Sequence, residues 1–113
     1  MKDDTVYLHH ILECIHRIEE HVAPGRAAFI ASHTLQDATL RNLQTLTEAT
    51  QRLSDAAKAT QPQILWQQIG AFRNILVHNY LGIDIEQVWT IIQRDVPPLK
   101  QAVIAMLAIP PSS

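Results

Sequence analysis

Apolar residues recur at intervals of three and four along most of this chain, and that spacing decides its fold class. The clearest stripe lies near the amino terminus and consists of Leu8, Ile11, Leu12, Ile15, Ile18 and Val22. Residues with this spacing lie on one face of an α-helix. Only 3 glycines and 5% aromatic residues leave little room for a many-turned β fold. The spacing therefore predicts an all-α protein.

Breaks in the periodicity divide the chain into predicted helices. They cover residues 3–22, 26–32, 34–60, 62–79, 85–94 and 99–109. Asp3 or Asp4 can cap the first helix, Thr34 and Asp37 resemble a capping box, and Asp84 can cap the fifth. Pro97-Pro98 marks a break before the last helix. Short connections favour antiparallel neighbours, so we expect an up-and-down antiparallel bundle of four long helices plus short ones.

Composition limits the class of protein. The 113 residues suffice for one domain, which we expect to span 1–113. With 9 basic and 11 acidic residues the net charge is −2, which excludes a polybasic nucleic-acid binder. The single cysteine, Cys14, excludes an internal disulfide and reads as a small buried hydrophobe. No apolar run is long enough for a bilayer and no signal peptide is apparent, so we expect a cytoplasmic protein without a membrane partner.

The stretch LWQQIGAFRNILVHNY, residues 65–80, carries the chemistry. On a helical wheel Arg73 and Tyr80 fall within an apolar arc, and Asn74 and His78 share the adjacent face. An arginine in a core-facing stripe is costly unless it is paired. Arg73 could pair with a carboxylate such as Glu48, and His78 could cap carbonyls at the end of the helix. In that case the polar residues would form a purely structural network.

Arginine and histidine together also suit chemistry at a phosphate. A guanidinium binds phosphoryl oxygens in a fork and neutralises their developing charge. An imidazole can move a proton to or from a ribose hydroxyl near neutral pH. RNA cleavage by the 2′-hydroxyl needs both a base and an acid, but this arc holds one histidine per chain. A symmetric dimer with two such arcs face to face would supply both.

The pattern Arg-x-x-x-x-His-x-Tyr, from Arg73 to Tyr80, resembles the signature of the HEPN superfamily and specifically its HepT-like branch. The resemblance extends from about Leu8 to Ile104. It includes Trp66, Ile69-Gly70-Ala71-Phe72, Leu81-Gly82-Ile83-Asp84, Trp89, Pro97-Pro98-Leu99 and Arg41-Asn42-Leu43 with Glu48-Ala49 and Arg52-Leu53. Where that branch often has Gly-Glu-Ala, this chain has Thr47-Glu48-Ala49, which affects packing and not the motif.

The resemblance implies a helical bundle that forms a homodimer, or a higher assembly, with the site at the dimer interface. Such proteins are metal-independent endoribonuclease toxins that need no cofactor and act on RNA. Arg73 would stabilise the transition state, His78 would be the general acid or base, and Asn74 would support the site. The usual partner is an MntA-like minimal nucleotidyltransferase, the antitoxin, which silences the toxin by transferring AMP to the motif tyrosine. Here that residue would be Tyr80.

Two other functions remain open at this point. The chain could be a non-catalytic subunit that binds substrate or partner for a separate nucleotidyltransferase, or a plain helical interaction module. A metal site drawn from His9, Glu13 and His16 is disfavoured, because solvated pairs one turn apart are far commoner. We expect Trp89 in the core or a dimer interface, and Arg41 and Arg52 at the surface.

Overall fold

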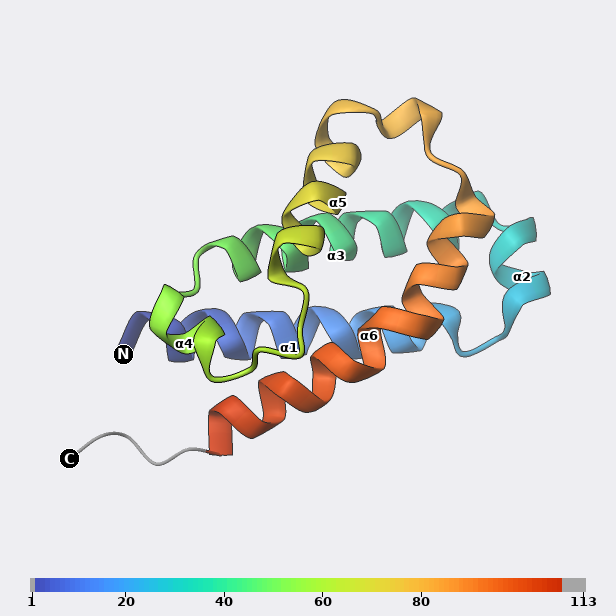
Figure 1. The fold of residues 1–113 in the computed structure, drawn as a ribbon. Helices are drawn as coiled ribbons and strands as arrows, with labels where there is room; N and C mark the ends of the chain where they lie inside the picture. Colours follow the sequence, from blue (N-terminus) through green and yellow to red (C-terminus); the bar gives the residue numbers. More distant parts are fainter. Residues whose placement is uncertain (1, 109–113) are drawn as a thin grey trace.

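A computed structural model describes residues 2–108 of the chain and confirms the all-α class. Within this range the chain forms helices and no strands (Figure 1). The elements are α1 (Lys2–Val22), α2 (Arg26–Ala31), α3 (His33–Gln51), α4 (Asp55–Ala59), α5 (Trp66–His78), the 3-10 turn η1 (Tyr80–Gly82) and α6 (Ile85–Ala108). Four of these helices are long, as predicted: α1, α3, α5 and α6. None of the helices in residues 2–108 has the length and apolar character needed to span a bilayer.

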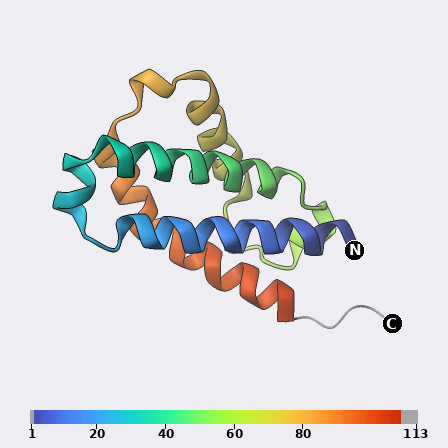
Figure 2. The ribbon, with the colours of Figure 1, turned by 180° about the vertical axis from the view of Figure 1, so that it is seen from behind.

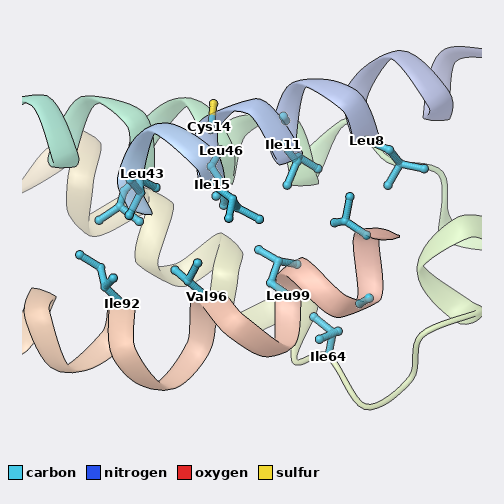
Figure 3. Close-up of a cluster of buried hydrophobic side chains, with 14 of the residues drawn as sticks. Leu8, Ile11, Cys14, Ile15, Leu43, Leu46, Ile64, Ile92, Val96 and Leu99 are labelled. Carbon is cyan, nitrogen blue, oxygen red and sulfur yellow. The ribbon is translucent and has the colours of Figure 1, made fainter. Parts of the chain in front are cut away.

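The core lies between α1, α3 and α6. Helices α1 and α3 run side by side in opposite directions (Figure 2), and α6 returns against α1. Their apolar stripes meet in a continuous cluster (Figure 3). Its members include Leu8, Ile11, Ile15, Leu43, Leu46, Ile92, Val96 and Leu99. Helix α5 packs chiefly on α3 and supplies one buried residue, Leu76.

The second predicted long helix is wrong at both ends. It starts at His33, with the Ser32 hydroxyl accepting a hydrogen bond from the Leu35 N–H at 3.1 Å, and not at a Thr34–Asp37 capping box. It ends at Gln51, and the chain then turns into α4, which Ser54 caps. Serine is a strong capping residue, so it competes with continuation of the helix.

The sequence had suggested that Asp4 caps α1. Instead, Asp4 stabilises the turn between α3 and α4. Its two carboxylate oxygens accept hydrogen bonds from the N–H and the hydroxyl of Ser54, each at 2.7 Å. Burial alone would raise the pKa of Asp4, but the two bonds from Ser54 outweigh it and lower the pKa. Asp4 therefore ties the start of α1 to the junction of α3 and α4. The side chain of Asp3 lies outside the described part of the structure.

The predicted break at Pro97-Pro98 is also wrong, because α6 continues through both prolines. Proline removes the N–H that would bond to the carbonyl four residues earlier and bends the helix. Those carbonyls belong to Gln93 and Arg94, which are exposed and can be hydrated. Figure 1 shows α6 changing direction between its orange and red halves. Burial of Val96 and Leu99 on either side holds the two halves in one core.

The remaining boundaries follow from local hydrogen bonds. Helix α5 begins at Trp66 and not at Pro62, after a short turn. The indole N–H of Trp66 donates to the carbonyls of Lys58 and Gln61 at 3.1 and 3.2 Å. Asp84 caps α6 as predicted, since its carboxylate accepts from the N–H groups of Glu86 and Gln87. The contacts of Trp66 fix the start of α5, and those of Asp84 fix the start of α6.

Candidate functional site

Helix α5 lies across α3 and presents the predicted motif along its second half (Figure 1). It ends at His78, one residue earlier than predicted, because Asn79 leaves helical geometry with φ −134° and ψ 40°. The chain then forms the turn η1, which holds Tyr80. The helical wheel therefore applies to Arg73, Asn74 and His78, which lie in α5. It does not apply to Tyr80, which lies outside the helix.

Arg73 is held only in part by its neighbours. One terminal N–H donates to the Asn74 carboxamide oxygen at 3.2 Å. The other terminal nitrogen lies 3.8 Å from a carboxylate oxygen of Glu48 on α3. That is longer than the roughly 2.7–2.9 Å of a charge-assisted hydrogen bond. The Nε atom is buried and has no hydrogen-bond partner among the described residues. The predicted pairing with Glu48 is present, but it leaves donors of the guanidinium unused.

Asn74 and His78 are both exposed. Asn74 contacts Arg73, whereas His78 lies five positions further along α5 and about 140° around its axis from Arg73. Within residues 2–108 the His78 side chain makes no hydrogen bond to a carbonyl or to another side chain. The suggestion that His78 caps the end of the helix is therefore wrong. Its imidazole is open to a ligand, and its two ring nitrogens can serve as donor and acceptor.

Tyr80 contacts Asp37, the residue expected from the sequence to form a capping box with Thr34. Its hydroxyl donates to a carboxylate oxygen of Asp37, on α3, at 3.3 Å. Burial raises the pKa of Tyr80, and the charge and hydrogen bond of Asp37 raise it further. The ring is nevertheless 43% exposed. No local pattern marked this contact, because Asp37 and Tyr80 meet only after α5 has packed on α3.

Several apolar side chains around the motif are uncovered. Ile75 is 47% exposed, Val77 is 37% exposed and Leu81 is fully exposed at 100%. On a helical wheel Val77 lies on the core-facing side with Arg73, whereas Ile75 lies on the opposite side of α5. Exposed apolar side chains at the end of one helix and in the turn that follows are candidates for contact with another molecule. This region, Ile75, Val77 and Leu81, is called the apolar edge of α5 below.

The remaining candidate residues lie away from the motif. Arg41 on α3 and Arg52, directly after the end of α3, are both exposed, as expected. Glu13 pairs with Arg17 at 2.8 Å, and the part of the chain that the structure describes holds no cluster of three metal-ligating side chains. His9, Glu13 and His16 therefore do not form a metal site there. Trp89 packs against Phe29 with ring centroids 5.4 Å apart, and Cys14 is buried, with a pKa raised by that burial.

Comparison with known proteins identifies the family. The family model for HepT-like proteins, described as "Ribonuclease HepT-like", matches residues 11–106. The chain belongs to the HepT-like ribonuclease family. This family is part of the HEPN superfamily, as the sequence motif indicated. Ribonuclease activity is thus supported at the level of the family.

Named relatives agree with this assignment. "Probable ribonuclease HepT" of Thermococcus cleftensis is 32% identical over 95 residues, 83% of this chain and 86% of the relative. "Putative RNase TTE0752" of Caldanaerobacter subterraneus subsp. tengcongensis is 30% identical over 108 residues, 95% and 96% of the two chains.

A longer relative, "Gamma-glutamylcyclotransferase and putative RNase MJ0434" of Methanocaldococcus jannaschii, is 33% identical over 107 residues. This match covers 94% of the present chain but only 48% of the relative. The chain therefore spans about half of that protein. No solved structure matches the chain.

The contact between Asp37 and Tyr80 gives a direct prediction. Asp37→Asn should lower the pKa of Tyr80 toward its ordinary value of 10.0, because the negative charge that opposes ionisation is removed. Ultraviolet titration in a Tyr7→Phe background, where Tyr80 is the remaining tyrosine, measures this pKa. Asp95→Asn, an exposed site on α6, is the matched control. An unchanged pKa in Asp37→Asn would show that the hydrogen bond does not form in solution.

Proposed function

We propose that this chain is a metal-independent endoribonuclease toxin whose site is formed by Arg73 and His78. Membership of the HepT-like ribonuclease family supports the activity. The observation that carries the proposal is the guanidinium of Arg73, which keeps unused donors on the same helix as the exposed imidazole of His78. A purely structural arginine would be expected to have its donors satisfied.

The proposed reaction is transesterification within RNA. The 2′-oxygen attacks the adjacent phosphorus and loses its proton to a base, while the bond from phosphorus to the 5′-oxygen breaks. An acid protonates the leaving 5′-oxygen, so the products are a 2′,3′-cyclic phosphate and a 5′-hydroxyl. His78 transfers protons in this scheme, and Arg73 stabilises the negative charge that develops on the phosphoryl oxygens. Asn74 supports the site by accepting a hydrogen bond from Arg73 at 3.2 Å.

A homodimer would complete the acid–base pair. His78 lies five positions after Arg73, so the two side chains leave α5 about 7.5 Å apart along its axis. One chain supplies a single imidazole on this face, whereas the reaction uses a base and an acid. The exposed apolar edge of α5 adjoins His78 and fits a self-complementary contact. A second copy seated there would bring two His78 side chains toward one phosphate.

Tyr80 is the proposed site of control by a cognate minimal nucleotidyltransferase. AMP transfer would form a bond between the phenolic oxygen and the α-phosphorus of ATP, release pyrophosphate and remove the phenolic proton. Asp37 accepts a hydrogen bond from that hydroxyl and is placed to take up the proton. The attached nucleotide would add bulk and negative charge near Arg73. Both effects oppose binding of an RNA phosphate.

Cleavage tests the catalytic roles. Arg73→Ala and His78→Ala should each reduce the rate of RNA cleavage by about 100-fold or more, with the fold retained by circular dichroism. Activity should persist in a chelator, and the products should carry 2′,3′-cyclic phosphate ends. Arg41→Ala, an exposed arginine on α3, is the matched control and should keep nearly full activity. Wild-type protein that never cleaves RNA would instead favour a non-catalytic partner subunit.

Sedimentation tests the dimer. Leu81→Asp should shift the protein from dimer to monomer, because it places a charge in the apolar contact. Val6→Asp is the control, since Val6 is 66% exposed on α1 and lies outside the apolar edge of α5. Equal masses for Leu81→Asp and wild type would rule out this interface.

Mass spectrometry tests the modification. Incubation with an MntA-like minimal nucleotidyltransferase and ATP should add the mass of AMP and abolish RNA cleavage. Tyr80→Phe should stay unmodified, whereas Tyr7→Phe should be modified like wild type. Modification of the Tyr80→Phe variant would locate the acceptor elsewhere.

A further inference from the structure

A cavity of about 810 Å³ opens at the start of α5, between α4 and the end of α3. Its lining includes one indole, three carboxamides, one positively charged side chain and one negatively charged side chain. The residues that provide these groups are Trp66, Gln51, Gln67, Gln68, Lys58 and Asp55. The volume lies within the roughly 300–1,000 Å³ typical of small-ligand sites.

The indole of Trp66 is fixed in place. Its N–H is already bonded to the carbonyls of Lys58 and Gln61, so the ring offers the cavity an aromatic surface and not a donor. The two bonds also join the end of α4 to the start of α5, which makes the cavity wall rigid. A rigid aromatic face is a stacking platform for a planar ring.

The carboxamides around this ring are available for hydrogen bonding. Gln51, Gln67 and Gln68 make no side-chain hydrogen bonds within residues 2–108. The Gln51 amide lies over Gly70, where an added Cβ would come within 3.0 Å of its nitrogen. Glycine at this position therefore gives the amide its place in the cavity. Each carboxamide pairs a donor with an acceptor, as the edges of nucleobases do.

One wall of the cavity, at Gln67, lies on the side of α5 that carries Asn74 and His78. Gln67 precedes Asn74 by seven residues and His78 by eleven, a spacing that places all three on one helical face. The rise from Gln67 to Asn74 is about 10 Å. Between them Gly70 and Ala71 carry no large side chain, so an RNA strand can pass along this face from the cavity toward Asn74 and His78.

We propose that this cavity binds an unpaired nucleobase that flanks the scissile phosphate in single-stranded RNA. The inference rests on the ribonuclease function proposed above. The base stacks on Trp66, and Gln67 with its neighbouring carboxamides bonds to the base edge. Lys58, which has no ion-pair partner in the described residues, neutralises a nearby phosphate. Proteins bind single-stranded RNA in this way, by stacking and by contacts to base edges.

The test uses a fluorescent RNA oligonucleotide made non-cleavable by 2′-O-methyl groups, and matched versions with one abasic position. In a Trp89→Phe background, the intact RNA should quench Trp66 fluorescence, and the RNA that is abasic at the flanking position should not. Gln67→Ala should weaken binding of the intact RNA about two- to ten-fold and leave binding of that abasic RNA unchanged. Gln93→Ala, an exposed glutamine on α6, should match wild type for both.

Three results would overturn the proposal. These are unaltered Trp66 fluorescence with RNA, no effect of Gln67→Ala, or equal weakening by Gln67→Ala for intact and abasic RNA. The cleavage assay separates this outcome from failure of the proposed function. If wild-type protein cleaves RNA while the fluorescence of Trp66 stays unquenched, the proposed ribonuclease function stands and the proposed base site is ruled out. If RNA quenches the fluorescence of Trp66 but wild-type protein does not cleave RNA, a base-binding site stands and the proposed ribonuclease function is ruled out.

Discussion

The packing of α5 on α3 is the contact on which the candidate site depends. Helices α1, α3 and α6 share the core, whereas α5 contributes only Leu76 to its fully buried part. Trp66, Ile69 and Phe72 pack against the core only in part, and the opposite side of α5 stays free, including Asn74 and His78. A helix buried on all sides could not present polar groups to a ligand. The modest packing of α5 is thus what makes a site possible on such a small domain.

The same contact explains the state of Arg73. Its side chain is 29% exposed and lies where α5 meets α3, so it is too enclosed to be fully hydrated. Glu48 is close enough to compensate its charge but too far for a short hydrogen bond, and Nε has no partner among the described residues. Incomplete satisfaction costs folding free energy. A phosphate oxygen can recover part of that cost, which makes the arginine a better anion receptor than one held in a bidentate pair.

Sequence periodicity predicted the helices, and the resemblance of the motif from Arg73 to Tyr80 indicated the family, but neither predicted the contacts between distant residues. The stripe of α1 and the Asp84 cap depend on nearby residues, and both are as predicted. The errors at Ser54 and at Pro97-Pro98 arise because tertiary burial and competing caps override local preference. In the site, Arg73 and His78 were found from one helix, whereas the Asp37 partner of Tyr80 lies 43 residues away. Such a partner is visible only in the folded chain.

A net charge of −2 also restricts how this protein can bind RNA. A domain without a positive field cannot hold a duplex by its phosphates over a long stretch. Its affinity has to come from a few local contacts. The proposed phosphate contact at Arg73 and the proposed base site at Trp66, both on α5, would supply them. Stacking needs bases that are not paired with a complementary strand. The charge and the shape of the domain therefore favour single-stranded RNA, read over a short segment, as the substrate.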